Sequence, residues 1–232
     1  MASGSTLIHA SEPARALANR VLSPVARGLV AAGVTANAVT AVALALSLAA
    51  ALLLASGRFA AATPFIVFAS IGDALDGVLA RMSATASPGG ALFDAAADRY
   101  QEMAILAGLA IHLREDVASL AIVLAALLAS FMVSYGSAKA EALRVPVPPG
   151  SMRRLERSVC LCAGVALVPV ARALVAALGA ATWLAEAPIL VALAVVAIVG
   201  NASAVARLRV VAALARPTNG EAPGRTQAVR AP

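Results

Sequence analysis

The chain has 232 residues, of which 61% are hydrophobic and 13% charged, and its mean hydropathy is +0.89. A soluble domain carries about 25% charged residues, so the composition excludes an ordinary soluble protein and predicts one multi-pass membrane unit. The net charge is +6, but aromatic residues make up only 3% and no nucleic-acid-binding module is present, so we expect no nucleic-acid partner.

The N-terminal arm is predicted to contain a helix that lies on the membrane surface. At about 100° per residue, Leu22, Val25 and Leu29 share one face of this helix, and Arg20 and Arg27 share the opposite face. This pattern is typical of an amphipathic helix in the membrane interface. We therefore expect the arm to anchor the chain beside its first span.

Six apolar runs follow the arm, each near the ~20 residues that a bilayer-spanning helix needs. They extend roughly over Val39–Ser56, Phe59–Arg81, Gly90–Leu113, Val117–Lys139, Ser158–Leu178 and Ala187–Ala206. The predicted fold is an all-α integral membrane protein with six transmembrane helices and an N-terminal amphipathic interfacial helix. The predicted divisions are the arm (1–33), the six-helix transmembrane domain (34–215) and a disordered tail (216–232).

The orientation of the spans follows from the basic residues between them. Most of these residues, including Arg81, Lys139 and Arg144, lie on the side of the two termini, whereas the other side carries chiefly Arg58 and Arg114. Cytoplasmic loops of membrane proteins are enriched in Lys and Arg. Both termini are therefore predicted to be cytoplasmic, and the Ala- and Arg-rich composition suggests a bacterial cytoplasmic membrane.

Four aspartates lie close to the short turn SATASPGG, which joins the second and third spans. Asp73 and Asp76 are three residues apart, and Asp94 and Asp98 are four apart, so each pair lies on one face of its helix. Because the turn is tight, the two helices are predicted to be antiparallel neighbours. The two acidic faces can then meet across a small gap at the cytoplasmic end.

Four carboxylates in a partly desolvated site repel one another, so protonation or bound cations must relieve the repulsion. Oxygen ligands suit Mg²⁺ or Mn²⁺, and two such ions in one site are a recurrent device for phosphoryl chemistry. Acidic residues at helix ends are often only solvated, but ionisable groups within membrane segments are usually functional. Gly77, Ala80, Gly89 and Gly90 leave room for a ligand, and Arg81 could reach a phosphate.

These residues form one long pattern, D-G-x-x-A-R, then eight residues, then G-x-x-x-D-x-x-x-D. The pattern is filled by Asp76, Gly77, Ala80, Arg81, Gly90, Asp94 and Asp98. It resembles the signature of the CDP-alcohol phosphatidyltransferase family, and Asp73 upstream also fits. The six spans and the amphipathic arm match the family as well, so the resemblance covers most of the chain.

The resemblance implies a phospholipid-synthesising enzyme that transfers a phosphatidyl group from CDP-diacylglycerol to an alcohol and releases CMP. It implies two Mg²⁺ or Mn²⁺ ions held by Asp73, Asp76, Asp94 and Asp98, and Asp98 as the base that takes the proton of the acceptor hydroxyl. It also implies a homodimer, and CDP-lipid contacts from Asn37, Thr40, Gly77, Ala80, Arg81, Ser87 and Gly90. The family often has Pro where Ala36 stands, and this Asn and Thr also fit an ordinary helix start.

The acceptor is indicated by basic residues at the cytoplasmic ends of the later spans. The candidates for binding its phosphate are Lys139, Arg153, Arg157 and Arg207. Membrane topology alone also predicts basic residues there. The elements S-Y-x-x-A-K-A-E-A and R-x-E-R resemble the phosphatidylinositol phosphate synthase branch, which implies inositol phosphate as the acceptor.

Three alternatives remain at this stage. Glycerol phosphate, serine or another small polar alcohol could replace inositol phosphate in the same chemistry. A metal or proton transporter would also use buried carboxylates, but it would tend to place them near the midplane of the membrane, with interrupted helices and an internal repeat. A family member that binds a nucleotide lipid without catalysis would be expected to lose one of the acids.

Overall fold

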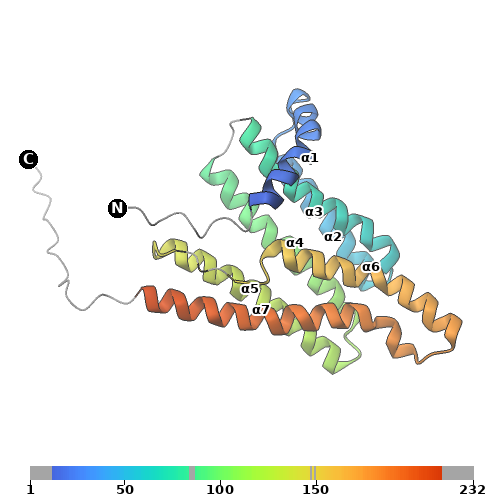
Figure 1. Cartoon of the computed structure of the whole chain (residues 1–232). Coiled ribbons are helices and arrows are strands. Elements are labelled where there is room, and N and C mark those ends of the chain that lie inside the picture. Colours follow the sequence, from blue (N-terminus) through green and yellow to red (C-terminus); the bar gives the residue numbers. More distant parts are fainter. Residues whose placement is uncertain (1–11, 84–86, 147, 149, 216–232) are drawn as a thin grey trace, which may run out of the picture.

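The computed structural model of the protein describes residues 12–83, 87–146, 148 and 150–215 (Figure 1). Every regular element in these ranges is a helix, in agreement with the predicted all-α fold. The elements are α1 (Glu12–Ala31), α2 (Ala36–Ala55), α3 (Phe59–Met82), α4 (Pro88–His112), α5 (Val117–Ala142), α6 (Arg154–Leu178), the short 3₁₀ helix η1 (Thr182–Glu186) and α7 (Ala187–Leu214). The predicted disordered tail, 216–232, lies outside the described residues.

Five stretches of this described part are long and apolar enough to cross a membrane. They are α2, α3, α5, α6 and Thr182–Leu214, which contains η1 and α7. Helix α4 has 25 residues and is long enough, but Asp94, Asp98, Arg99 and Glu102 make it too polar to qualify by composition. The protein is therefore a multi-pass membrane protein with five spans evident from composition.

Polar residues at the predicted turns begin the helices around the acidic site. Thr35 Oγ1 accepts a hydrogen bond from Ala38 N at 3.2 Å at the start of α2, and Ser87 Oγ accepts one from Gly90 N at 3.1 Å at the start of α4. Pro88 occupies the first turn of α4, where its missing N–H costs nothing. Helix α7 continues to Leu214, whereas the predicted sixth span ends at Ala206. Arg207 and Arg209 end the apolar run at that point, but the helix continues through them.

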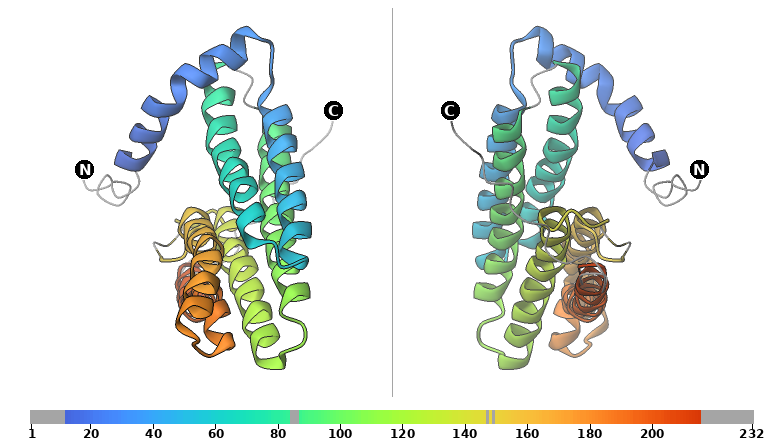
Figure 2. Two further views of the ribbon diagram at one scale, coloured as in Figure 1. Left: turned by 90° about the vertical axis from the view of Figure 1, so that its right-hand side faces the viewer. Right: turned by 90° about the vertical axis from the view of Figure 1, so that its left-hand side faces the viewer.

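Helix α2 is the scaffold on which the acidic helices are mounted. Both α3 and α4 pack extensively against α2 and much less against each other, although the views in Figure 2 show the three running side by side. The contact between α2 and α4 is very close, because a Cβ on Gly108 would lie 2.4 Å from the carbonyl oxygen of Ala51. Small residues permit such approaches between membrane helices.

The remaining helices form a second layer. Helix α5 lies along α7 for much of its length (Figure 1), and α6 packs between α7 and α3. At the end far from the acids, Arg172 on α6 donates a hydrogen bond to the carbonyl of Gly57 at 2.8 Å and pairs with Glu186. The ring of His112 packs edge-on against Phe59, with the ring centroids 4.9 Å apart. These contacts tie α6 and η1 to the turn between α2 and α3, and α4 to α3, at the end opposite the acids.

Helix α1 leans away from the bundle and touches it near its C-terminal half (Figure 2). Ala26 is buried against α3, and Leu22 and Leu29 pack beside it. Val25, which we placed on the same face, is exposed and does not pack against α3. Arg20 is exposed on the other side, in agreement with an amphipathic helix.

Candidate active site

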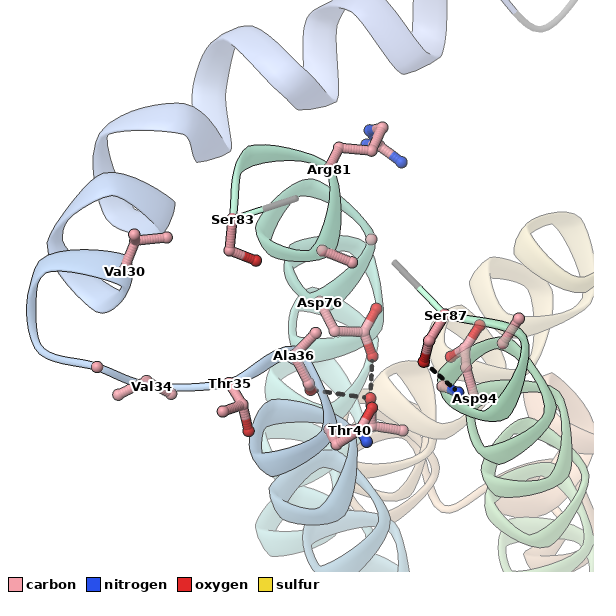
Figure 3. A pocket seen from close by; sticks show the side chains of 16 residues that line it. Val30, Val34, Thr35, Ala36, Thr40, Asp76, Arg81, Ser83, Ser87 and Asp94 are labelled. Atoms are coloured by element: carbon pink, nitrogen blue, oxygen red, sulfur yellow. Dashed lines mark hydrogen bonds between the residues drawn. The ribbon is translucent and has the colours of Figure 1, made fainter. Parts of the chain in front are cut away.

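A pocket of about 600 Å³ opens where α1 and α3 end and where α2 and α4 begin (Figure 3). Two of the four aspartates, Asp76 and Asp94, line it from α3 and α4. All seven residues that the sequence predicted for the CDP-lipid also line it, namely Asn37, Thr40, Gly77, Ala80, Arg81, Ser87 and Gly90. Val30 and Val34 add an apolar edge from the end of the arm. Residues that are far apart in the sequence signature therefore lie around one pocket in the structure, and the lining of this pocket comes from four helices.

Asp76 is fixed within this pocket by a hydrogen bond from α2. Thr40 Oγ1 donates to Asp76 Oδ2 at 2.6 Å, and the Thr40 hydroxyl also lies 3.1 Å from the carbonyl oxygen of Ala36 (Figure 3). Both side chains are buried. A buried carboxylate requires such a donor, so Thr40 both lines the pocket and orients the acid.

The other two aspartates, Asp73 and Asp98, line a second and smaller cavity of about 50 Å³. Arg154, the first residue of α6, hydrogen-bonds to Asp73, and its Nη2 lies 2.7 Å from Asp98 Oδ1. The sequence paired the acids by helix, but the structure divides each pair. Asp76 of α3 and Asp94 of α4 line the large pocket, whereas Asp73 of α3 and Asp98 of α4 contact Arg154.

The donor chemistry of these four side chains fits hard divalent cations. Asp76 and Asp98 each experience repulsion from both Asp73 and Asp94, which a bound cation would relieve. Asp98 Oδ1 is buried and, apart from its ion pair with Arg154, has no hydrogen-bond donor. In the described part of the chain no three acidic, His or Cys side chains converge as a preformed cluster.

Three of the four basic residues predicted to bind the acceptor gather near the start of α6. Arg207 on α7 donates to Ser137 Oγ at 2.9 Å and to the carbonyl oxygen of Gly150 at 3.2 Å. Arg153 and Arg157 are close enough to Arg207 to repel it electrostatically. Lys139, the fourth, is exposed in the last turn of α5.

Arg157 has its donors directed into the protein. Its guanidinium forms two hydrogen bonds to Glu102, at 2.7 and 3.0 Å, and a third to the carbonyl oxygen of Met152 at 2.6 Å. The side chain is only 1% exposed. Arg153, in contrast, is exposed at the first turn of α6, so a small ligand can reach it far more easily than Arg157.

Sequence reasoning did not single out Gln101 or Glu102, and it included Arg154 only as part of the R-x-E-R element, without a role beside the acids. Gln101 and Glu102 follow Asp98 by three and four residues, so they lie on the acidic face of α4. Arg154 precedes Arg157 by three residues and shares its face of α6. Helical spacing from the named residues was the signal that could have found all three, since polar groups within a membrane segment are seldom idle.

The fold and the site describe a multi-pass membrane protein that gathers four carboxylates and several basic side chains around two cavities at one end of its helices. The chain belongs to the CDP-alcohol phosphatidyltransferase family, whose model matches residues 33–185. The matched segment contains all four aspartates and every residue predicted to contact the CDP-lipid. This membership confirms the predicted enzyme class and leaves no support for the transporter alternative.

Among curated relatives, phosphatidylinositol phosphate synthase of Mycobacterium tuberculosis is 34% identical over 155 residues, which are 65% of this chain and 71% of that protein. The synthase of Mycobacterium marinum is 36% identical over 155 residues, 65% of this chain and 66% of its own length. Both names agree with the branch that the sequence pattern indicated.

Solved structures of the Mycobacterium tuberculosis phosphatidylinositol phosphate synthase share the fold. The structure with CDP-DAG bound has a TM-score of 0.71 and 28% identity, and the match covers 83% of this chain and 94% of that one. The structure in complex with manganese and citrate also has a TM-score of 0.71, with 27% identity and coverage of 82% and 88%. The family resemblance therefore extends from the signature to the arrangement of the helices.

Proposed function

We propose that this protein is a phosphatidylinositol phosphate synthase, which transfers the phosphatidyl group of CDP-diacylglycerol to inositol phosphate and releases CMP. The observation that carries the proposal is the pocket of about 600 Å³, because it gathers all seven predicted CDP-lipid residues with Asp76 and Asp94. The names of the relatives and the CDP-DAG bound to the similar mycobacterial structure support the same lipid substrate.

The proposed reaction is an exchange of one phosphate ester for another. The acceptor hydroxyl oxygen attacks the phosphorus that carries diacylglycerol, the bond from that phosphorus to the CMP oxygen breaks, and CMP leaves with the bonding electrons. Asp98 takes the proton of the hydroxyl as general base. Gly77 and Gly90 leave space for the diphosphate beside the backbone, and Arg81 lines the same pocket and would contribute positive charge to it.

Divalent ions are the cofactor in this proposal, and Asp73, Asp76, Asp94 and Asp98 would hold them. Two ions, Mg²⁺ or Mn²⁺, would supply the positive charge that offsets the diphosphate and the leaving CMP. The manganese in the similar mycobacterial structure supports a hard cation for this set of oxygen ligands. Arg154 now stands between Asp73 and Asp98, so it must yield to any ion that these two acids share.

Inositol phosphate is proposed as the acceptor because several basic residues gather near the start of α6, and one of them, Arg154, lines the small cavity with Asp73 and Asp98. Arg153, Arg154 and Arg207 lie around the start of α6, Lys139 lies in the last turn of α5, and Arg154 contacts Asp73 and Asp98. A sugar phosphate offers both the anion for these cations and the hydroxyl for Asp98. Serine, the alternative alcohol, carries no phosphate for these cations to bind.

The acceptor is tested by offering purified protein CDP-diacylglycerol, Mg²⁺ or Mn²⁺ and one alcohol at a time. We expect CMP release and a lipid of the mass of phosphatidylinositol phosphate with inositol phosphate, and much slower release with free inositol, glycerol phosphate or serine. Faster release with glycerol phosphate would favour the main competitor. Failure with every alcohol, in an assay where a mycobacterial synthase works, would contradict the proposed function as a whole.

We also propose that α4 is a sixth span with its charges facing the protein interior, so that both termini and the active site are cytoplasmic. Arg58→Cys and Arg114→Cys should then react with a membrane-impermeant maleimide in intact cells, and Arg144→Cys only after permeabilisation. The parent protein, with Cys160 and Cys162, gives the background. Labelling of Arg114→Cys only after permeabilisation would show that α4 does not cross.

The homodimer remains part of the proposal. Large apolar side chains such as Leu52, Phe68 and Leu92 are exposed on the bundle, and small residues allow membrane helices to pack closely. Light scattering of the detergent-solubilised protein should give twice the mass of one chain after subtraction of the detergent. A single-chain mass across the working range of protein concentration would argue against it.

A further inference from the structure

Gln101 is a buried amide on α4 that the proposed reaction does not use. It lies three residues beyond Asp98, and it is 5% exposed. Burying a primary amide among apolar helices costs free energy unless its donors and its acceptor are hydrogen-bonded. The partners of this amide therefore indicate why it is there.

The amide connects α2 to α3 through two hydrogen bonds. Gln101 Nε2 donates to Asp73 Oδ1 at 2.9 Å, and Ser47 Oγ donates to Gln101 Oε1 at 3.2 Å. The direction of this relay is fixed at the Asp73 end, because an ionised carboxylate only accepts hydrogen bonds. The amide NH₂ must face Asp73, so the amide oxygen faces Ser47, whose hydroxyl must then be the donor. Ser47 is itself buried on α2.

Asp73 is thereby held at its two oxygens by unlike partners. Oδ2 contacts Arg154, which reaches in from the start of α6 on a long side chain that is 30% exposed. Oδ1 contacts Gln101, which is buried where α2 and α4 pack, and a Cβ on Gly108 of α4 would overlap Ala51 of α2. Gln101 therefore reaches Asp73 from a closely packed helix contact, whereas Arg154 reaches it on a partly exposed side chain.

We propose that Gln101 is a positioning residue that orients Asp73, and that Ser47 acts only through Gln101. This inference rests on the proposed role of Asp73 in holding divalent ions. Helix α2 would then orient one acid of each cavity, since Thr40, seven residues before Ser47 and on the same face, holds Asp76. Loss of the relay leaves all four acids in place but lets one of them turn away.

Binding of Mn²⁺ to the detergent-solubilised protein, measured without lipid by the electron paramagnetic resonance signal of free Mn²⁺, tests this role. Gln101→Leu is expected to weaken Mn²⁺ binding by about 10- to 100-fold, the usual effect of removing a hydrogen-bond partner of a metal ligand. Gln101→Met supplies a second apolar side chain of similar length, and thermal unfolding checks that each variant is folded.

Ser47→Ala provides an independent test, because it leaves Gln101 intact but frees its amide to rotate. We expect a smaller loss of Mn²⁺ affinity than for Gln101→Leu. The double variant Ser47→Ala/Gln101→Leu should bind Mn²⁺ as Gln101→Leu does, because Ser47 then has nothing to orient. Additive losses in the double variant would overturn the role of Ser47. Thr63→Val, which removes a hydroxyl bonded to its own helix at Phe59, should bind Mn²⁺ like the parent protein.

Asp73→Asn separates failure of this inference from failure of the proposed function. If Asp73→Asn weakens Mn²⁺ binding while folded Gln101→Leu and Gln101→Met bind it like the parent protein, the positioning role of Gln101 is wrong and the ion site stands. If Asp73→Asn itself binds Mn²⁺ like the parent protein, Asp73 is not a ligand and the proposed ion site is wrong. Parallel losses in Asp73→Asn and both Gln101 variants support the inference.

Discussion

Replacement of Asp98 by asparagine is expected to slow CMP release by roughly 10²–10⁴-fold, the range that a general base contributes. Asparagine has almost the same size and can still hydrogen-bond, but it cannot take a proton at neutral pH. Asp98 is mostly buried and faces the small cavity beside Asp73 and Arg154, so water has little access to replace it. The measurement is the initial rate of CMP release at saturating CDP-diacylglycerol and inositol phosphate.

The control for this substitution is Asp116→Asn at the opposite end of the bundle. Asp116 begins α5, and hydrogen bonds from the Ser119 side chain and backbone N–H lower the pKa of its carboxyl. Asparagine is an equally good residue at a helix start, so CMP release should stay near the parent rate. CDP-diacylglycerol should still bind to Asp98→Asn, because the large pocket is lined by other residues. A rate within a few-fold of the parent protein would contradict the assignment of the base.

The helices could be predicted closely from sequence because lipid allows few alternatives. A run of about 20 apolar residues must become a helix to satisfy its backbone, and Gly, Pro and Ser at the turns mark its ends. The predicted second span, Phe59–Arg81, differs from α3 by a single residue. The extension of α7 to Leu214 could not be seen in the same way, because Arg207 and Arg209 interrupt the apolar run without interrupting the helix.

The signature predicted which residues line the pocket but not how the acids divide. Spacing places Asp73 and Asp76 on one face of α3, and it says nothing of what lies opposite that face. The division into two cavities arises because α3 and α4 are both mounted on α2, which leaves Asp73 and Asp98 facing Arg154. The sequence separates Arg154 from Asp98 by more than fifty residues, so their ion pair is a property of the tertiary fold.

Arg157 shows the same limit in the acceptor region. A basic residue at a cytoplasmic helix end predicts a phosphate contact, but in the structure Arg157 forms an ion pair with Glu102. Substitution Arg157→Met is therefore expected to destabilise the protein by about 3–5 kcal/mol, because it leaves the carboxylate of Glu102 buried without its two best hydrogen bonds. The measurement is thermal unfolding of the detergent-solubilised protein, in which the folded fraction left after heating is determined by size-exclusion chromatography.

The double variant Glu102→Gln/Arg157→Met distinguishes a structural ion pair from a ligand contact. In the double variant residue 102 no longer carries a buried charge that has lost its main partner, so most of the lost stability should return. Arg153→Met, a charge removal at an exposed neighbouring position, should leave stability within about 0.5 kcal/mol. If Arg157 contacts the acceptor instead, Arg157→Met should unfold like the parent protein and raise the KM for inositol phosphate. If the double variant recovers stability and keeps a parent-like KM for inositol phosphate, Arg157 has a structural role in holding α6 against α4. The acceptor contacts would then be Arg153, Arg207 and Lys139.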